Sequence, residues 1–429
     1  MRLKAITIHN FRGIEDLEIP FDGRTTILFG VNGVGKTTIL RAIDLIYANI
    51  IAKVTASKKL AELAYDDISY GKSFAMIDAV FSFDDGLEVK YGRSIYRAGG
   101  RKHKKEELNF LIEEFENRYI VKGYDDGEGN WIEAEDTKNM PVFVNYGVNR
   151  QVINVLVSVS AKEQFTKLSA FDKSIDSKID FKSLFRWFRN QEDLENQEKV
   201  RRQADYTDRS LSAVKKAMLA MLDGFEDIHI DRHPLAMKAM KDGKYLKINQ
   251  LSDGEKCTIA LFGDLARRMA LANPQLNNPL EGTGVVLIDE LDLHMHTSWQ
   301  RKVAKILKDV FPNVQFIVTT HSPQILGEGD DDFNLFYLKE ENQRIILKAY
   351  RSFIGWDANV ILEEVMDTPS VNQNIRNSVE EMYEHIDNHE YDKAEEIADM
   401  LDDKSSGYVD GVAKARVLIS RGRRREKNC

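Results

Sequence analysis

The chain has 429 residues, of which 43% are hydrophobic and 30% are charged, and its formal net charge is −9 at pH 7. Such a chain can bury one large core or two linked ones, and its acidic balance argues against a general nucleic-acid coat protein. The sequence has two cysteines without metal-ligand spacing, which excludes a disulfide framework and a cysteine-built zinc site. No apolar run approaches the roughly 20 residues of a membrane helix, which excludes a membrane segment.

The first 150 residues contain strands on either side of one helix. Residues 1–10 alternate like a strand rather than a secretory leader, which indicates a cytoplasmic protein. Residues 25–29 form a β-rich apolar run that ends in glycine. From Thr37 the apolar residues recur at three- and four-residue spacing, which predicts a helix. Residues 74–97 read as two strands joined by a glycine turn, and 142–146 as a further short strand. We therefore expect a strand, a glycine loop and a helix beside an antiparallel layer.

The remaining residues alternate helices with two buried-type strands. Residues 162–225 are mostly helical in pattern without a sustained heptad, which predicts a compact lobe rather than a coiled-coil arm. Strands at 285–288 and 314–319 alternate with helices and indicate a parallel sheet, while the residues from Phe353 onward are polar and helical in pattern. The predicted fold class is α/β, a mixed sheet with an antiparallel β layer, a helical lobe and a C-terminal helical module. The predicted boundaries are 1–150, 151–245, 246–352 and 353–429.

Residues 30–37 match the pattern G-x-x-x-x-G-K-[ST] between a strand and a helix. Glycines let backbone N–H groups wrap phosphates, Lys36 reaches the β and γ oxygens, and Thr37 can ligate Mg²⁺. A glycine-rich turn with a chance lysine is the alternative, but the flanking strand and helix favour a phosphate-binding loop. The predicted binding residues here are Asn32, Gly33, Gly35, Lys36, Thr37 and Thr38.

Asp289 and Glu290 follow the strand at 285–288, at the sheet edge where ligands bind. We expect Asp289 to hold Mg²⁺ through water and Glu290 to orient and deprotonate the attacking water. Asp289 could instead cap the next helix, a reading that the phosphate loop disfavours. His321 follows the strand at 314–319, so a parallel sheet brings it to the same edge, where it can contact the γ-phosphate or the water.

Residues 251–256, Leu-Ser-Asp-Gly-Glu-Lys, form a serine-and-glycine turn that opens a helix. The hydroxyl of Ser252 and the N–H groups near Gly254 can bind an anion. The same residues can equally form an ordinary capping box, with Ser252 as the N-cap and Glu255 three residues later. Both interpretations stay open at this stage.

These four motifs together resemble the ABC ATPase superfamily, and residues 10–13 and 288–296 are similar to its RecF and SMC branch. Asp253 replaces a glycine of the common L-S-G-G-Q signature. The resemblance implies ATP and Mg²⁺ as ligands, and a head-to-tail dimer in which Ser252 of one copy meets the ATP held by Lys36 of the other. It also implies that Asp292 lies in the loop that connects the two sites. Gln151 lies near the family's glutamine loop, but its spacing does not fix that assignment.

A narrower resemblance to the PtuA ATPases of Septu antiphage systems, which also occur with retrons, rests on residues 141–150, 185–188 and 355–359. The resemblance implies higher homo-oligomers and regulation of a separate HNH nuclease subunit. No ββα site with paired histidines or cysteines is evident in this sequence, which matches a nuclease on another chain. His385 and His389 are four apart on an expected helix but lack the glutamate of H-E-x-x-H. His294 and His296 fit the family pattern, and we expect a structural or inter-subunit role for them.

Two other functions remain to be weighed. A RecF/SMC-like repair ATPase would bind DNA directly, through the basic segments 101–105 and 421–427, although solvated ends are the simpler interpretation of both. An OLD-type nuclease would carry a Toprim domain after the ATPase head. Only 108 residues follow His321 and they are mostly helical in pattern, which leaves little sheet for such a domain.

Overall fold

The computed structural model describes the chain except for residues 58–60, 122–123, 126–130, 133–137, 151–164, 202–204, 330, 343, 371, 406–408, 410 and 427–429. It divides into two compact units, Met1–Trp356 and Asp357–Cys429. Among the described residues, no helix is both long enough and apolar enough to cross a bilayer.

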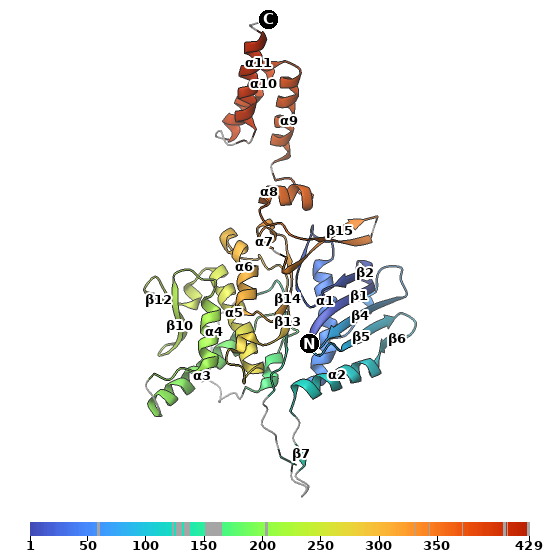
Figure 1. Ribbon diagram of the computed structural model, residues 1–429, viewed down its shortest axis with the longest axis vertical. Coiled ribbons are helices and arrows are strands. Elements are labelled where there is room, and N and C mark those ends of the chain that lie inside the picture. The colour runs from blue at the N-terminus through green and yellow to red at the C-terminus, as the bar shows by residue number, and fades with distance from the viewer. Residues whose placement is uncertain are drawn as a thin grey trace. The chain divides into compact units, whose positions relative to one another are not determined.

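The first unit is built on a six-stranded sheet in the order β16-β15-β3-β14-β13-β9. Figure 1 labels β13, β14 and β15 of this sheet. All neighbouring strands are parallel except the pair β15 and β16, which is antiparallel. Strands β3, β9, β13 and β14 are buried along their whole length, as expected for parallel strands covered on both faces. The bounds are β3 Thr25–Phe29, β9 Val142–Tyr146, β13 Gly284–Ile288, β14 Val314–Thr320, β15 Phe333–Glu341 and β16 Arg344–Tyr350.

A second, antiparallel sheet has the order β2-β1-β4-β5-β6, and helix α1 packs between it and the central sheet. Tyr47 of α1 stacks on Phe143 of β9 with a centroid distance of 3.8 Å and meets Phe81 of β4 edge-on at 5.5 Å. One aromatic side chain thus joins both sheets. The bounds are β1 Arg2–Phe11, β2 Ile14–Pro20, α1 Lys36–Val54, η1 Tyr65–Asp67, β4 Phe74–Ser82, β5 Glu88–Tyr96, β6 Gly100–His103, α2 Lys105–Tyr119, β7 Tyr124–Asp125 and β8 Trp131–Ile132.

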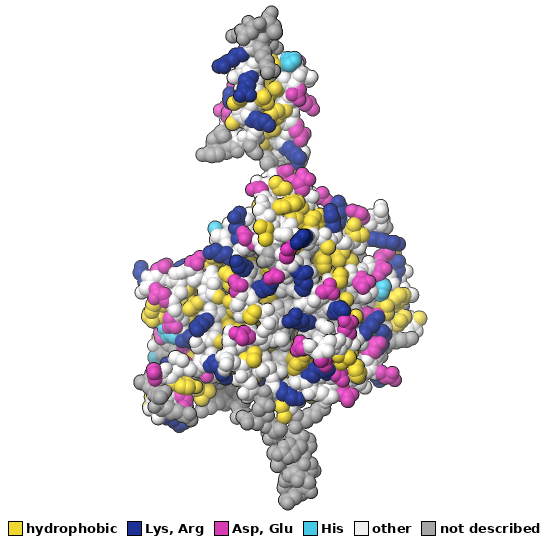
Figure 2. Space-filling view, in the orientation of Figure 1, with side chains coloured by type: hydrophobic (Ala, Val, Ile, Leu, Met, Phe, Trp, Pro, Cys, Tyr) yellow, Lys and Arg dark blue, Asp and Glu magenta, His cyan; other side chains and the backbone are white. Residues whose placement is uncertain are grey.

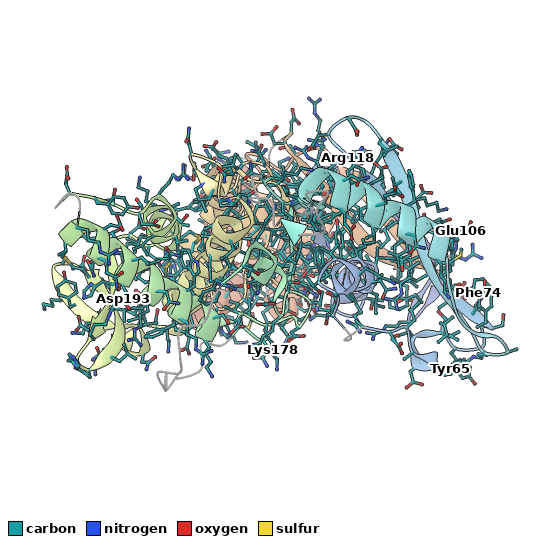
Figure 3. The ribbon with its side chains drawn as sticks, turned by 90° about the horizontal axis from the view of Figure 1, so that it is seen from below. Tyr65, Phe74, Glu106, Arg118, Lys178 and Asp193 are labelled. Carbon is teal, nitrogen blue, oxygen red and sulfur yellow. The ribbon has the colours of Figure 1, made fainter. Side chains whose placement is uncertain are left out.

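Helix α5 packs against β9, with α3 and α4 against α5 in turn. Seen from below, this lobe and the layer of α2 lie on opposite sides of the central strands (Figure 3). A three-stranded antiparallel sheet, β10-β11-β12, extends the lobe and leads through η3 into α5. The bounds are η2 Lys167–Phe171, α3 Phe181–Arg201, α4 Arg209–Leu219, β10 Phe225–Arg232, β11 Leu235–Lys241, β12 Lys244–Lys247, η3 Ile248–Gln250, α5 Asp253–Ala272, η4 Pro279–Glu281, α6 Thr297–Val310 and α7 Pro323–Leu326.

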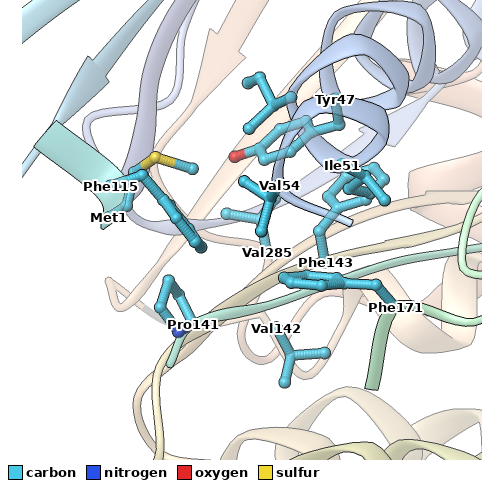
Figure 4. Close-up of a pocket in the computed structure, with 11 residues that line it drawn as sticks. Met1, Tyr47, Ile51, Val54, Phe115, Pro141, Val142, Phe143, Phe171 and Val285 are labelled. Carbon is cyan, nitrogen blue, oxygen red and sulfur yellow. The ribbon is translucent and has the colours of Figure 1, made fainter. Parts of the chain in front are cut away.

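An apolar cavity lies beside the C-terminal half of α1, near the amino ends of β9 and β13 (Figure 4). Its lining includes Met1, Val54, Phe115 and Val285. Its volume of about 10 Å³ leaves room for no more than about one water molecule. Because the carboxyl ends of β9 and β13 are at the other edge of the sheet, this cavity is a packing gap away from the predicted site.

The second unit has its own hydrophobic core, formed by three helices. Met382 and Ile386 of α9 share this core with residues of α10 and α11, including Leu401 and Ala415. The bounds are α8 Ala358–Val360, η5 Ile361–Val365, α9 Gln373–Asp387, α10 Tyr391–Ser405 and α11 Val412–Glu426.

The α/β fold class with its mixed sheet, antiparallel layer and C-terminal helices is confirmed. The lobe predicted as helical at 151–245 contains α3 and α4 but also the unpredicted sheet β10–β12. Helix α2 and strands β15 and β16 were likewise not predicted. The four domain boundaries remain predictions, since the contacts group residues 1–356 into one unit, and Gln151 lies outside the described residues.

Candidate nucleotide-binding site

The carboxyl ends of four adjacent parallel strands form one edge of the central sheet. The glycine loop follows β3, His321 follows β14, and Asp289 and Glu290 follow β13. Arg150 comes shortly after β9, the neighbour of β13. Because β3, β14, β13 and β9 are consecutive in the sheet, residues from four distant parts of the chain meet at one edge.

The loop before α1 has a backbone that its glycines make possible. Gly30 has φ 148°, and a Cβ there would lie 2.3 Å from the carbonyl oxygen of Leu338 in β15, so a larger residue would collide with the neighbouring strand. Gly35 is the N-cap of α1 with φ 98°, and no side chain caps this end. The N–H groups of the first turn therefore remain available to an anion. Asn32, Gly33 and Thr37 are exposed on the rim, and Thr38 is half-buried.

Lys36 is a buried cation that folds back onto its own loop. Its Nζ donates hydrogen bonds to the carbonyl oxygens of Gly30 at 2.8 Å and Val31 at 2.9 Å. Burial lowers the pKa of Lys36 from 10.5 to about 8, although Asp289, Glu290 and Asp292 act to raise it. The ammonium group thus lies near three carboxylates. Phosphate oxygens can replace the loop carbonyl oxygens as its hydrogen-bond acceptors.

Thr37 and Asp289 are in direct contact. Thr37 Oγ1 donates to Asp289 Oδ2 at 2.9 Å, and Thr319 Oγ1 donates to Asp289 Oδ1 at 2.6 Å. Asp289 is 5% exposed and caps no helix; the N-cap of α6 is His296. A hydroxyl and a carboxylate are hard oxygen donors of the kind that Mg²⁺ prefers, together with phosphate and water oxygens. The donor set therefore fits Mg²⁺.

Hydrogen bonds join the loop after β13, which carries Glu290 and Asp292, to the end of β14 and to His321. Glu290 has φ 49°, and its N–H donates to Thr319 Oγ1 at 2.7 Å. Asp292 Oδ1 accepts from Thr320 Oγ1 at 2.5 Å and from the N–H of His321 at 3.3 Å. Burial and the charge of Lys36 lower the pKa of His321, against the opposing effect of the nearby carboxylates, so its imidazole is kept neutral. The loop after β13 and the end of β14 are thus one hydrogen-bonded group.

Ser252 forms the capping box that the sequence allowed. Its Oγ accepts from the N–H of Glu255 at 3.3 Å and donates to Glu255 Oε2 at 2.8 Å. A Cβ on Gly254 would lie 2.5 Å from the carbonyl oxygen of His294, so the signature turn packs against the loop that carries Asp292. The capping role does not exclude anion binding, because the hydroxyl can rotate toward a stronger acceptor.

Comparisons with known proteins show what this chain is similar to. A family model described as "AAA domain" matches residues 5–217. A second model, described as "AAA domain, putative AbiEii toxin, Type IV TA system", matches residues 157–327. The "Retron Ec83 probable ATPase" of Escherichia coli is 28% identical over 431 residues, covering 86% of this chain and 76% of that protein. The "Septu protein PtuA" of Bacillus mycoides is 25% identical over 375 residues, covering 84% of this chain and 44% of that protein. The chain is similar to a retron ATPase and to the Septu protein PtuA.

The "DNA replication and repair protein RecF" of Macrococcus caseolyticus is 31% identical over 120 residues, covering 28% of this chain and 29% of that protein. The predicted resemblance to PtuA and to the RecF and SMC branch is therefore confirmed. A solved Smc head domain derived from Pyrococcus furiosus has 17% identity to this chain and a TM-score of 0.48. That alignment covers 85% of this chain and 99% of the Smc chain.

Arg150 is a site residue that sequence reasoning did not assign. Its guanidinium is 3% exposed and donates to the carbonyl oxygens of Asp289, at 3.0 Å, and Glu290. The sulfur of Cys257, in α5, lies 3.5 Å from the Arg150 carbonyl oxygen. Arg150 therefore connects the acidic pair to the helix that begins at the signature turn. The available signal was its place just after a predicted strand of the parallel sheet.

The discounted histidines have ordinary structural contacts, with one correction. His389 was expected on a helix with His385, but α9 ends at Asp387 and His389 has φ 62°. His385 lies 2.5 Å from a carboxylate oxygen of Glu390. His296 caps α6 through Ser298, which is a structural role as expected. Within the described residues, no group of three or more His, Cys, Asp and Glu side chains is placed to hold a metal ion.

Proposed function

We propose that this chain is the ATP-hydrolysing subunit of a retron- or Septu-type antiphage system and that it regulates a separate HNH nuclease. The observation that carries the ATPase part is the convergence of the glycine loop, Thr37–Asp289, Glu290 and His321 at one sheet edge. The antiphage part is supported by similarity to the retron Ec83 and Septu PtuA proteins. The HNH partner is implied by the family resemblance alone.

Each residue has a role that follows from its position. Lys36 and the first-turn N–H groups of α1 bind the β- and γ-phosphates of ATP, with Asn32, Gly33, Gly35 and Thr38 around them. Thr37 and Asp289 would hold Mg²⁺, which neutralises phosphate charge when bound. Glu290 orients the attacking water and takes its proton, while neutral His321 faces the γ-phosphate. Asp292, tied to His321, relays the state of one site to the other.

The site is completed by a second copy of the chain. Ser252 and Gly254 lie at the N-terminus of α5, and the neighbouring side chain of Asp253 is 81% exposed. A helix N-terminus with exposed polar groups can receive the γ-phosphate held by another copy. The proposed active form is therefore a head-to-tail dimer at minimum, within a higher homo-oligomer.

The shared site is tested by mixing two inactive variants. Lys36→Ala removes the phosphate-binding cation, and Ser252→Arg blocks the signature turn. A mixed dimer contains one site with both defects and one intact site, so we expect hydrolysis to recover after mixing. Each variant alone, at the same total concentration, is the control. Absence of recovery would contradict the shared site.

The nuclease partnership is tested separately by coexpressing this chain with the product of the neighbouring reading frame. We expect the two proteins to copurify, and we expect the Glu290→Gln variant to copurify equally while changing nucleic-acid cleavage. Cleavage that is the same with wild-type and Glu290→Gln chains would contradict regulation by ATP hydrolysis. Metal-dependent cutting by the purified chain alone would favour the OLD-type alternative.

Direct DNA binding is the alternative function. In the basic tail, Arg423 lies near carboxylates of Asp392 and Glu395. On the face visible in Figure 2, Lys and Arg side chains of the first unit are interspersed with Asp and Glu rather than gathered in one stripe. Tight, salt-sensitive binding of duplex DNA by the chain without a partner would nevertheless favour this alternative.

A further inference from the structure

The signature turn of this chain carries two carboxylates at the place where the proposed dimer must accept a phosphate. Asp253 is the first residue of α5 and Glu255 the third. A like charge beside an incoming phosphate opposes its binding unless a cation compensates the carboxylate. The phosphate that reaches this turn belongs to ATP held by a second copy of the chain, so the inference rests on the proposed head-to-tail dimer.

Each of the two acids is paired with a lysine. Asp253 is exposed, and its carboxylate lies 2.7 Å from Lys256 Nζ in the same helix turn. Glu255 is 8% exposed, and its Oε1 accepts a hydrogen bond from Lys241 Nζ at 2.6 Å. The exposed pair is screened by water, whereas the buried carboxylate depends on its partner for compensation.

The environment of Glu255 is divided between two partners. Its Oε2 accepts from both the N–H and the hydroxyl of Ser252, each at 2.8 Å, while Oε1 faces Lys241. Burial acts to raise the pKa of Glu255, but the bonds from Lys241 and Ser252 outweigh it and lower the pKa. Glu255 is therefore charged, and the Ser252 hydroxyl is engaged with it before any phosphate arrives.

Lys241 comes from outside the signature turn. It is the last residue of β11, opposite Lys244 of β12 across a two-residue Asp242-Gly243 turn with φ values of 48° and 73°. Its Nζ lies 5.3 Å from the ring centroid of Phe225 at the start of β10. The strand end and the aromatic ring thus direct this side chain toward the start of α5.

We infer that Lys241 is a positioning residue that makes the signature turn competent to receive the γ-phosphate of a nucleotide held by a second copy of this chain. When the Ser252 hydroxyl turns to that phosphate, Glu255 loses one hydrogen bond but keeps Lys241 and the N–H of Ser252. The net charge of the turn stays compensated. Without Lys241, a buried carboxylate with no countercharge stands next to the phosphate and opposes closure of the dimer.

The test measures ATP hydrolysis by full-length chains. We expect Lys241→Met to lower hydrolysis about 10- to 100-fold, the effect of losing a charge-assisted interaction in the closed state, with nucleotide binding to the single chain unchanged. Adding Glu255→Gln to Lys241→Met removes the charge that needs compensation, and we expect hydrolysis to recover. Lys238→Met is the matched control on β11, because it lies on the opposite face and pairs with Asp231.

A mixing experiment distinguishes action on the partner's nucleotide from action within one chain. Lys241→Met chains mixed with Lys36→Ala chains form one intact composite site if Lys241 acts across the dimer, so hydrolysis should recover. Ser252→Arg mixed with Lys36→Ala is run in parallel. Recovery in that pair alone would overturn the role of Lys241 and leave the shared site standing, whereas failure of both pairs would overturn both. Full activity of Lys241→Met alone would also overturn the inference.

Discussion

Lys36 is a buried cation, and the protonation of its amine should depend on whether ATP is bound. Burial lowers its pKa to about 8, so the free chain loses this charge as pH rises through that value. Phosphate favours the charged form, so ATP binding above pH 8 must take up a proton. We expect ATP affinity to fall by up to about tenfold for each pH unit above 8, until the pKa of the bound form is reached.

Isothermal titration calorimetry in buffers of different ionisation enthalpy measures this proton uptake directly. Lys36→Met is the control, because it has no proton to take up and should bind ATP weakly at every pH. An ATP affinity that is constant from pH 7 to pH 9.5 would contradict the assignment of the titrating group to Lys36.

Arg150 should act on hydrolysis rather than on binding. Its guanidinium donates to the backbone oxygens of Asp289 and Glu290. Among the described residues, these bonds do not involve the glycine loop. We expect Arg150→Met to lower kcat about 10- to 100-fold, since bonds from a charged donor are lost where the water must be oriented. ATP affinity should change little. Single-turnover kinetics with an ATP-binding measurement checks this, and a loss confined to affinity would contradict it.

The difference between Lys36 and Arg150 explains which site residues the sequence could reveal. Glycines and a lysine at fixed spacing report a backbone that wraps phosphate, so residues 30–37 were predictable. Arg150 has no spacing signal, because its partners are carbonyl groups of residues about 140 positions away. Only the pairing of β9 with β13 brings them together. A contact to backbone oxygen leaves no complementary residue type to find in the sequence.

At the scale of elements, α5 is fixed by a buried group of charges. Asp264 accepts hydrogen bonds from Arg267 at 2.7 Å, from Arg268 at 2.8 Å and from Tyr146 of β9 at 2.8 Å. Arg268 also donates to the carbonyl oxygen of Ala170. The signature helix is therefore tied to the central sheet by groups that water does not reach.

Removing the carboxylate of Asp264, which Arg267, Arg268 and Tyr146 share, should destabilise the folded chain. We expect Asp264→Ala to lower the free energy of unfolding by about 3–5 kcal/mol, because two buried guanidinium groups lose their countercharge. Asp253→Ala, which breaks an exposed pair in the same helix, should leave the free energy of unfolding almost unchanged, because water screens that pair. Urea denaturation of both variants measures the difference, and equal destabilisation would show that the buried group does not fix α5.

The elements also differ in how well their sequences predict them. Strands β3, β9, β13 and β14 are continuous apolar runs because both faces are covered, so their pattern is distinct. Strands β10–β12 are only partly buried and rich in charge, so their sequence pattern does not distinguish them from the predicted helical lobe. The Asp-Gly pair between β11 and β12 was the signal that could have found that hairpin.

At the scale of the whole molecule, the chain consists of two units with separate cores. The second unit, Asp357–Cys429, buries its own apolar residues among α9, α10 and α11. Every residue placed here in the nucleotide site belongs to the first unit, Met1–Trp356. A unit with its own core can in principle fold alone. The two units should therefore be separable in folding and in nucleotide binding.

We expect a chain truncated after Trp356 to fold and to bind ATP with unchanged affinity, since Lys36, Thr37 and Asp289 keep all their described contacts. The complementary fragment 357–429 should show helical circular dichroism by itself. ATP should raise the thermal transition temperature of the truncated chain. The same truncated chain with Lys36→Met is the control, and ATP should not raise its transition temperature. A truncated chain that aggregates, or that folds without binding ATP, would show that the second unit supports the site.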